Sequence, residues 1–286
     1  MNPDWRTNYS AVPDPFPVPW ASAYGEDQYG YWATLSLGSV EQLFRWIHPG
    51  RFSMGSPLSE PKRDDDEIPH QVLLSHGFWL AETSCTQELW SEAKERAENP
   101  AHFKGAQRPV DSVSWDDAQQ WIEQLNRHVN SRGAQSGGGQ FRLPSEAEWE
   151  FSCRAETQTP FNVGNTITPD QLNYDGKFPY DNGAKGLYRK ETVPVKSFSP
   201  NSWGLYEMHG NVLEWCQDYY GEYPKSEILN PLGPAKGNHR VLRGGTWIYS
   251  GRRCRSAYRS DFEPAVRGNG VGLRLAWGPI QTSQDK

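Results

Sequence analysis

Glycine and proline interrupt this chain at short intervals, and this spacing limits what the chain can fold into. The sequence holds 27 Gly and 22 Pro in 286 residues, and the interior of a long helix does not tolerate proline. It also holds 13 Trp, 13 Tyr and 11 Phe, which is enough apolar material for a sizeable core. We therefore expect a globular protein in which turns and ordered loops outweigh regular elements.

Two segments are free of glycine and proline over a length that allows a helix. Apolar residues recur at intervals of three and four in residues 86–99 and 114–132, as expected for one buried helix face. Ser114 is a suitable N-cap for the second segment, and Asp116 and Asp117 fall in its first turn. These two segments are the main predicted helices.

A short third helix and a set of strands complete the predicted elements. Glu148 follows Ser145 at the spacing of a capping box, directly after a proline. Residues 31–56 alternate apolar and polar side chains in two bursts, which favours a hairpin or meander. Gly, Asn, Pro and Tyr dominate the second half of the chain, so we expect a loop-rich platform there.

Three parts of the chain are expected from composition. Residues 1–27 form a Pro- and aromatic-rich extension that is predicted to drape on the domain, because its Trp20 needs burial. Residues 28–278 form the domain, and residues 279–286 a short tail.

The charge balance excludes some partners. The net charge is -6 with dispersed basic residues, so the electrostatic footprint of a nucleic-acid binder is missing. No apolar run approaches the roughly 18 residues that span a bilayer, so membrane insertion is not expected. The first 20 residues lack the pattern of a signal peptide. We expect a cytoplasmic protein.

The four cysteines, Cys85, Cys153, Cys216 and Cys254, are far apart in the sequence. No CxxC spacing suggests zinc or a redox pair, so buried free thiols are favoured over a disulfide or a catalytic thiol. The acidic run 64–67 is either a solvated charged loop, which is favoured, or a calcium loop.

Three ordered blocks carry a family resemblance: "FRLPSEAEWEFSCRA", "WGLYEMHGNVLEWCQDYY" and "RVLRGGTW" with "CRSAYR" and "GLRLAW". They resemble the formylglycine-generating enzyme (sulfatase-modifying factor) family over roughly residues 40–278. The resemblance implies an α+β, C-type lectin-like fold, loop-rich, with a small antiparallel sheet and two main helices. Fold and function separate at this point, because one fold hosts many activities.

The family's active enzymes bind copper through a cysteine pair shortly after the "GGS" turn. This chain has Tyr249 where the first cysteine would fall and no cysteine at the second position, and Cys254 lies in a different frame. Because a soft copper ion needs thiolate ligands, no copper and no formylglycine synthesis are expected. His209 is favoured as a structural histidine over one that serves an iron-type enzyme of the family.

The "HGNVLEW" loop carries a metal expectation by resemblance. The family folds this loop around a structural calcium, and the matching positions are Asn211, the Val212 carbonyl and Glu214. A second calcium site would map near Asn173 and Tyr174. Oxygen ligands of these kinds suit a hard cation, and the alternative is a set of loops held by hydrogen bonds alone.

The closing stretch, residues 240–277, mixes a frame with scattered side chains that have no helical or strand period. The frame that matches the family is Gly244, Gly245, Trp247, Cys254, Arg255, Ser256, Ala257, Arg259, Arg267, Gly272 and Arg274. The candidate ligand-binding residues between them are Ile248, Tyr249, Ser250, Arg252, Arg253, Tyr258, Ser260, Asp261, Phe262, Val266 and Asn269. Most of these residue types are reachable from an asparagine codon by changing its adenines. The stretch therefore resembles the variable region of diversity-generating retroelement proteins.

This resemblance implies a ligand-binding protein that displays a diversified surface to a protein or other macromolecule. Tyr, Phe and Arg are typical paratope residues. Tyr249, Arg253, Tyr258, Phe262 and Val266 are predicted to form a continuous solvent-facing patch. The alternatives are a non-formylglycine oxidase or modifying enzyme of the family, and a structural or assembly partner.

Overall fold

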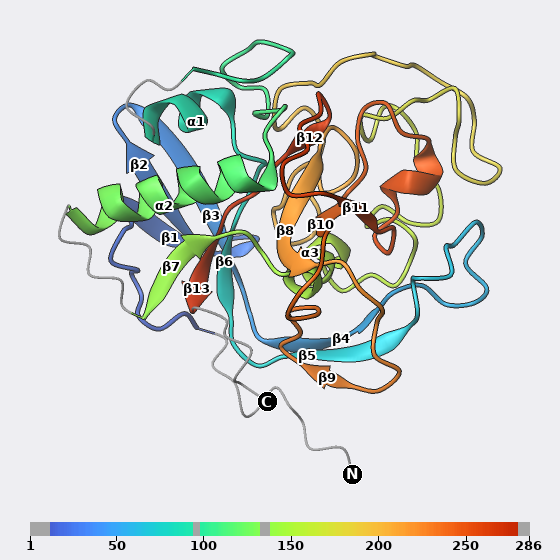
Figure 1. Cartoon of the computed structure of the whole chain (residues 1–286), viewed down its shortest axis with the longest axis horizontal. Coiled ribbons are helices and arrows are strands. Elements are labelled where there is room, and N and C mark those ends of the chain that lie inside the picture. The colour runs from blue at the N-terminus through green and yellow to red at the C-terminus, as the bar shows by residue number, and fades with distance from the viewer. Residues whose placement is uncertain (1–11, 94–97, 132–137, 280–286) are drawn as a thin grey trace.

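The largest sheet of the computed structural model has six strands in the order β1-β2-β3-β6-β13-β7 (Figure 1). The structure describes residues 12–93, 98–131 and 138–279. All neighbouring strands in this sheet are antiparallel. Its strands are β1 (Ala23–Asp27), β2 (Gly30–Leu37), β3 (Val40–Ile47), β6 (Phe78–Ala81), β7 (Gly139–Arg142) and β13 (Ala276–Pro279).

Two smaller sheets lie beside it. One has the order β11-β10-β8-β12 and the other β4-β5-β9, and both contain one parallel pair. Their strands are β4 (Gly50–Met54), β5 (His70–Leu74), β8 (Leu213–Tyr219), β9 (Ile228–Leu229), β10 (Arg240–Arg243), β11 (Ser260–Phe262) and β12 (Val271–Gly272). The predicted hairpin is β2–β3, and β4 continues into a separate sheet.

The predicted helices are confirmed. They are α1 (Gln87–Ala93), α2 (Trp115–Ser131) and α3 (Glu146–Arg154); residues 94–97 of the first prediction lie outside the described residues, as do 132–137. The Asp117 backbone N–H donates to Ser114 Oγ at 3.1 Å, and both halves of the capping box of α3 are present. The α+β class with two main helices and a loop-rich second half is therefore confirmed.

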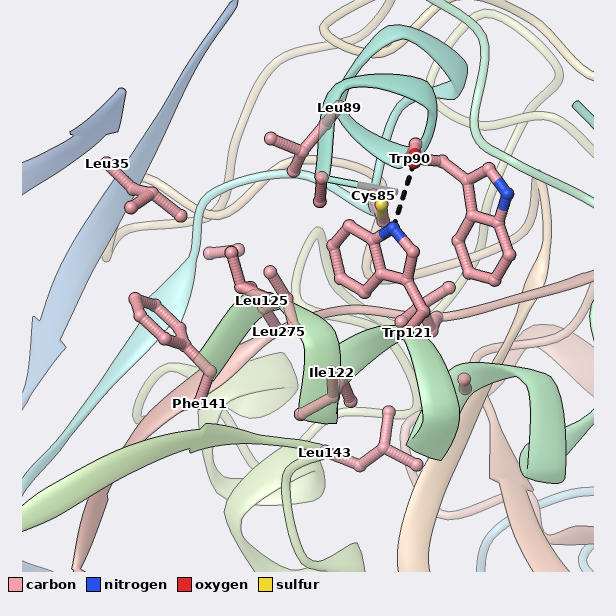
Figure 2. Close-up of a cluster of buried hydrophobic side chains, with 14 of the residues drawn as sticks. Leu35, Cys85, Leu89, Trp90, Trp121, Ile122, Leu125, Phe141, Leu143 and Leu275 are labelled. Carbon is pink, nitrogen blue, oxygen red and sulfur yellow. Dashed lines mark hydrogen bonds between the residues drawn. The ribbon is translucent and has the colours of Figure 1, made fainter. Parts of the chain in front are cut away.

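Helices α1 and α2 lie over one face of the six-stranded sheet (Figure 1). Figure 2 shows the core beneath them, where the rings of Trp90 and Trp121 stack with centroids 5.3 Å apart. Trp121 Nε1 donates to the Trp90 carbonyl at 2.9 Å, which satisfies the indole N–H inside an apolar environment. This core also includes Leu213, Leu242 and Leu275, so it joins the two halves of the domain.

The N-terminal extension is part of this core from Val18 onward. Val18 and Trp20 are buried, and the Trp20 ring contacts Phe44 with centroids 5.0 Å apart. Strand β1 pairs with β2, so the expected boundary between residues 27 and 28 falls inside a hairpin. Residues 1–11 and most of the predicted tail, 280–286, lie outside the described residues.

Within the described ranges, no helix combines the length and the apolar composition that a bilayer crossing requires.

Candidate ligand-binding surface

The closing stretch is built on the four-stranded sheet, where β10 pairs with β8 on one side and with β11 on the other. After β10 the chain turns at Gly244 and Gly245, whose φ angles are +98° and +77°. Residues other than glycine rarely adopt this conformation. A Cβ on Gly245 would lie 2.6 Å from the Arg253 carbonyl oxygen. Only glycine therefore lets this turn pack against the 3₁₀ turn η2 (Gly251–Cys254).

Buried arginines of the closing stretch anchor it to the rest of the domain. Arg255 Nη1 lies 2.6 Å from Glu60 Oε1, and Arg255 Nη2 lies 2.5 Å from Glu67 Oε1. Losing one partner of such a buried pair leaves an uncompensated charge, so these contacts fix the loops that they join. The other anchoring pairs are Arg243–Glu150, Arg259–Glu146 and Arg274–Glu214.

The acidic run 64–67 belongs to this anchoring network, so the favoured expectation of a solvated loop is wrong for Glu67. Glu67 is fully buried against Arg255, and the Arg255 contacts help to lower its pKa against the raising effect of burial. Asp64 forms an ion pair with Arg252. No local sequence pattern predicts these contacts, because Arg255 lies 188 residues after Glu67 in the chain.

The candidate residues of the closing stretch differ widely in exposure. Two are buried, Tyr258 and Ser260. Five are half-buried: Tyr249, Ser250, Arg252, Asp261 and Phe262. The remaining four are exposed and are called the exposed set below: Ile248, Arg253, Val266 and Asn269.

Tyr258 was expected at the surface, and that expectation is wrong. Tyr258 is buried, and its ring meets the Tyr249 ring edge-on, with centroids 6.4 Å apart. Burial raises the pKa of Tyr258 to about 12. The half-buried Phe262 lies on β11 and contacts the Trp215 ring at 6.4 Å. Phe262 is placed by the pairing of β11 with β10, which the irregular sequence does not show.

The exposed set lies on two segments that meet at Trp247. In the first segment, residues 248–253, the Arg253 guanidinium carbon lies 4.8 Å from the centroid of the Tyr249 ring. In the second segment, the Asn269 carbonyl accepts from Trp247 Nε1 at 3.0 Å. Trp247 itself is buried, so it holds both segments while its neighbours face solvent.

Of the predicted calcium ligands Asn211, Val212 and Glu214, the glutamate already has both carboxylate oxygens bound by protein donors. Glu214 Oε1 and Oε2 both accept from Arg274 Nε, at 3.1 and 2.9 Å, and Oε1 also accepts from Ser84 Oγ at 2.7 Å. A dication here would compete with a guanidinium that is itself fully buried. The Glu214 carboxylate therefore does not fit a calcium ligand.

The second predicted calcium position has one suitable oxygen. Asn173 Oδ1 is buried and has no hydrogen-bond partner in the described part of the chain, while its Nδ2 donates to Asn211 Oδ1 at 3.1 Å. Across the described ranges, no three His, Cys, Asp or Glu side chains gather in a way that suits a metal. Calcium at Asn173 and Tyr174 stays a prediction.

All four cysteines are buried free thiols, as predicted. Burial raises the pKa of Cys254 to about 12, and its Sγ donates to the Ser250 carbonyl at 3.8 Å. Tyr249 occupies the position that the resemblance assigns to the first copper ligand. With one protonated, buried thiol and no second cysteine in the closing stretch, these residues do not fit a copper site.

His209 is a structural histidine, as favoured from the sequence. Its Nδ1 lies 2.7 Å from the Cys254 carbonyl oxygen, and its Nε2 accepts the backbone N–H of Asn162 at 3.1 Å. Burial lowers its pKa to about 4, so the ring is neutral at pH 7, with the proton on Nδ1. The imidazole links three loops and has no free nitrogen for catalysis.

Two aromatic residues that no sequence pattern predicted at this surface, Phe103 and Tyr188, contact Trp247 from outside the closing stretch. Tyr188 stacks on Trp247 with centroids 6.1 Å apart, and Phe103 meets the same indole edge-on at 5.3 Å. The sequence signal was the aromatic content of these loops, but it does not say which rings reach Trp247.

Residues 39–279 match the family described as the Sulfatase-modifying factor enzyme 1-like domain. The formylglycine-generating enzyme of Mus musculus is 31% identical over 223 residues, which cover 75% of this chain and 55% of that protein. The serine/threonine-protein kinase pkn1 of Chlamydia caviae is 35% identical over 268 residues, covering 84% and 38%. The chain thus spans little more than half of one curated relative and less than half of the other.

Among solved structures, Treponema denticola variable protein 1 is similar with a TM-score of 0.73 and 29% identity. The match covers 86% of this chain and 98% of that one. The C-type lectin-like fold of the formylglycine-generating enzyme type is therefore confirmed, as is the likeness of the chain to a variable protein.

Proposed function

Because this chain belongs to the Sulfatase-modifying factor enzyme 1-like family, we propose that it uses the family's scaffold to bind a macromolecular ligand through a diversified surface. The surface comprises the exposed set together with the half-buried candidates of the closing stretch. The similarity of the chain to a variable protein, over 86% of the chain, supports a scaffold of this kind.

The observation that carries the proposal is the contrast between neighbours in the closing stretch. Frame residues such as Trp247, Arg255 and Arg274 are buried and bonded, whereas Ile248 and Arg253 are exposed between them. Substitution at the exposed positions removes few intramolecular contacts, so variation there costs little stability. A surface that tolerates variation on a fixed frame is the requirement for diversified binding.

The chemistry of the surface supports binding to a macromolecule. Tyr249 contributes a rigid ring with little conformational entropy to lose, and Arg253 contributes a planar donor group over that ring. Each aromatic side chain that a partner buries contributes roughly 1.5–3 kcal/mol before the costs of association. Copper chemistry has no support here, because the closing stretch does not fit a copper site.

Sequencing the DNA around the gene tests the proposal directly. We expect a near-copy of the codons for residues 244–275, with adenines at the candidate positions, beside a reverse-transcriptase gene. Natural isolates should then differ at the candidate positions and agree at the frame. Isolates with identical closing stretches and no such copy would overturn the proposal.

A further inference from the structure

Two strongly exposed apolar side chains lie near the closing stretch but outside it. Phe178 is 62% exposed and Leu187 is 59% exposed, while Ile248 in the exposed set is 49% exposed. A single exposed apolar residue is ordinary on a protein surface. Several such residues indicate a contact surface only when they lie on segments that are held together. The two segments here are loop 175–190 and the closing stretch.

Backbone hydrogen bonds join the loop 175–190 to the closing stretch. The Gly251 N–H donates to the Phe178 carbonyl at 2.9 Å, and the Asp175 N–H donates to the Tyr249 carbonyl at 2.9 Å. In Figure 1 the yellow-green to amber loops that contain these residues lie on the same side of the molecule as the orange-red loop after β10. Loop 175–190 therefore continues the candidate surface.

The backbone of loop 175–190 packs closely against itself and against the closing stretch. A Cβ on Gly251 would lie 2.7 Å from the Tyr180 nitrogen, and a Cβ on Gly176 would lie 2.4 Å from the Leu187 carbonyl oxygen. The Gly186 N–H also donates to the Gly176 carbonyl at 2.8 Å. Glycine at these positions lets the two backbone segments pack closely, which positions the backbone that carries Phe178 and Leu187.

The closing stretch and loop 175–190 each contain a basic side chain that lies over an aromatic ring. Arg253 lies over the Tyr249 ring in the closing stretch, and Lys177 Nζ lies 5.7 Å from the Tyr188 ring centroid in loop 175–190. The Tyr188 ring stacks on Trp247 with an interplanar angle of 15°. Loop 175–190 thus repeats the chemistry of the closing stretch at positions outside the region that resembles a variable one.

The charge of this loop is opposite to that of the whole chain. Residues 175–190 hold four Lys or Arg and two acidic residues, Asp175 and Asp181, whereas the chain carries a net charge of -6. Lys185, Lys190 and Arg253 are exposed. Within the described residues, none of these three cations is in an ion pair. They are free to meet acidic groups of a partner.

We propose that loop 175–190 supplies a constant, apolar and basic half of the binding surface, and that the occupant is an acidic protein surface with exposed apolar side chains. This inference rests on the proposed function, because it extends the same site. Apolar anchors surrounded by charge are the usual anatomy of a protein interface, and complementary charge speeds association and selects partners. Phe178 and Leu187 would anchor every ligand, while the diversified residues choose among ligands.

The probe is a phage-displayed library of random 16-residue peptides, selected on the full chain. We expect the selected peptides to be enriched in Asp and Glu together with Leu, Phe or Trp. The double variant F178S/L187S should weaken their binding by about tenfold or more, as loss of interface anchors does. The variant K185E/K190E should slow association and reduce its salt dependence.

The matched control is the double variant L58S/L229S, since Leu58 and Leu229 are 84% and 47% exposed and neither lies in loop 175–190 or the closing stretch. This control should bind the peptides like the wild type, and thermal melts should show that all variants fold. Vesicles with phosphatidylserine and a single-stranded oligonucleotide serve as the other anionic probes.

The outcomes separate this inference from the proposed function. Selected peptides that ignore F178S/L187S but depend on the exposed set would overturn the role of loop 175–190 and leave the proposed function standing. Peptides that ignore both sets would overturn both. Selection of no acidic peptide, or stronger binding of vesicles or oligonucleotide through these same residues, would overturn the acidic protein partner.

Discussion

Replacing Arg255 with Met should strongly destabilise the protein, because Arg255 lies between two buried carboxylates. Its side chain is fully buried and donates to both Glu60 and Glu67. Removing one partner of a buried, hydrogen-bonded ion pair costs about 3–5 kcal/mol. At about 2–4 °C per kcal/mol for a domain of this size, the melting temperature should fall by about 6–20 °C.

The matched control lies two residues earlier. Arg253→Met makes the same chemical change at an exposed position whose one described side-chain contact is with the Tyr249 ring. Its effect on the free energy of unfolding should stay within about 1 kcal/mol. Guanidinium titrations of both variants measure the difference, and adding E60Q and E67Q to Arg255→Met should recover much of the loss. Equal effects of the two Met variants would refute the anchoring role of Arg255.

Four more predictions follow from described contacts. Burial and the nearby Glu146 raise the pKa of Asp218 to about 8, above the unfolded value near 3.9. Between these two pH values only the folded state keeps the proton. The stabilising contribution of this group is therefore full below about pH 4 and is lost as the pH rises through 8. Asp218→Asn should flatten that decline in pH-dependent melts. Glu214→Gln should lower the melting temperature equally with calcium and with chelator, because it breaks the Arg274 pair; a loss that occurs only with calcium would contradict this. Serine at all four positions of the exposed set should change stability by no more than about 0.5 kcal/mol each, whereas Tyr258→Ala should cost about 3 kcal/mol in the same denaturant assay. A sulfatase-type cysteine peptide incubated with the protein and Cu(I) should show no formylglycine by mass spectrometry.

Much of the fold was predictable because its signals are local. The period of α2 and the Ser145–Glu148 capping box each lie within a few residues of the element that they specify. The free thiols were predictable because isolated cysteines in an apolar context behave as small core residues. The exposure of Ile248 and Arg253 also followed from their place among turn-forming residues.

The binding surface was predictable only in part, because burial there depends on partners far away in the chain. Tyr258 and Ser260 look like their exposed neighbours in sequence, yet both are buried: Ser260 lies on β11, paired with Leu242 of β10, and the Tyr258 ring meets that of Tyr249. Glu67 looks like part of a solvated acidic run, yet Arg255 withdraws it from water.

The sequence by itself determined the fold family, the helices and the frame of the closing stretch, since repeated local patterns and ordered motifs encode these. Only the tertiary structure decided which side chains between the frame residues reach solvent. It also decided that loop 175–190, which carries the exposed Phe178 and Leu187, is hydrogen-bonded to the closing stretch. The physical reason is that these loops are positioned by buried ion pairs and backbone hydrogen bonds between distant segments, and no local pattern records such contacts.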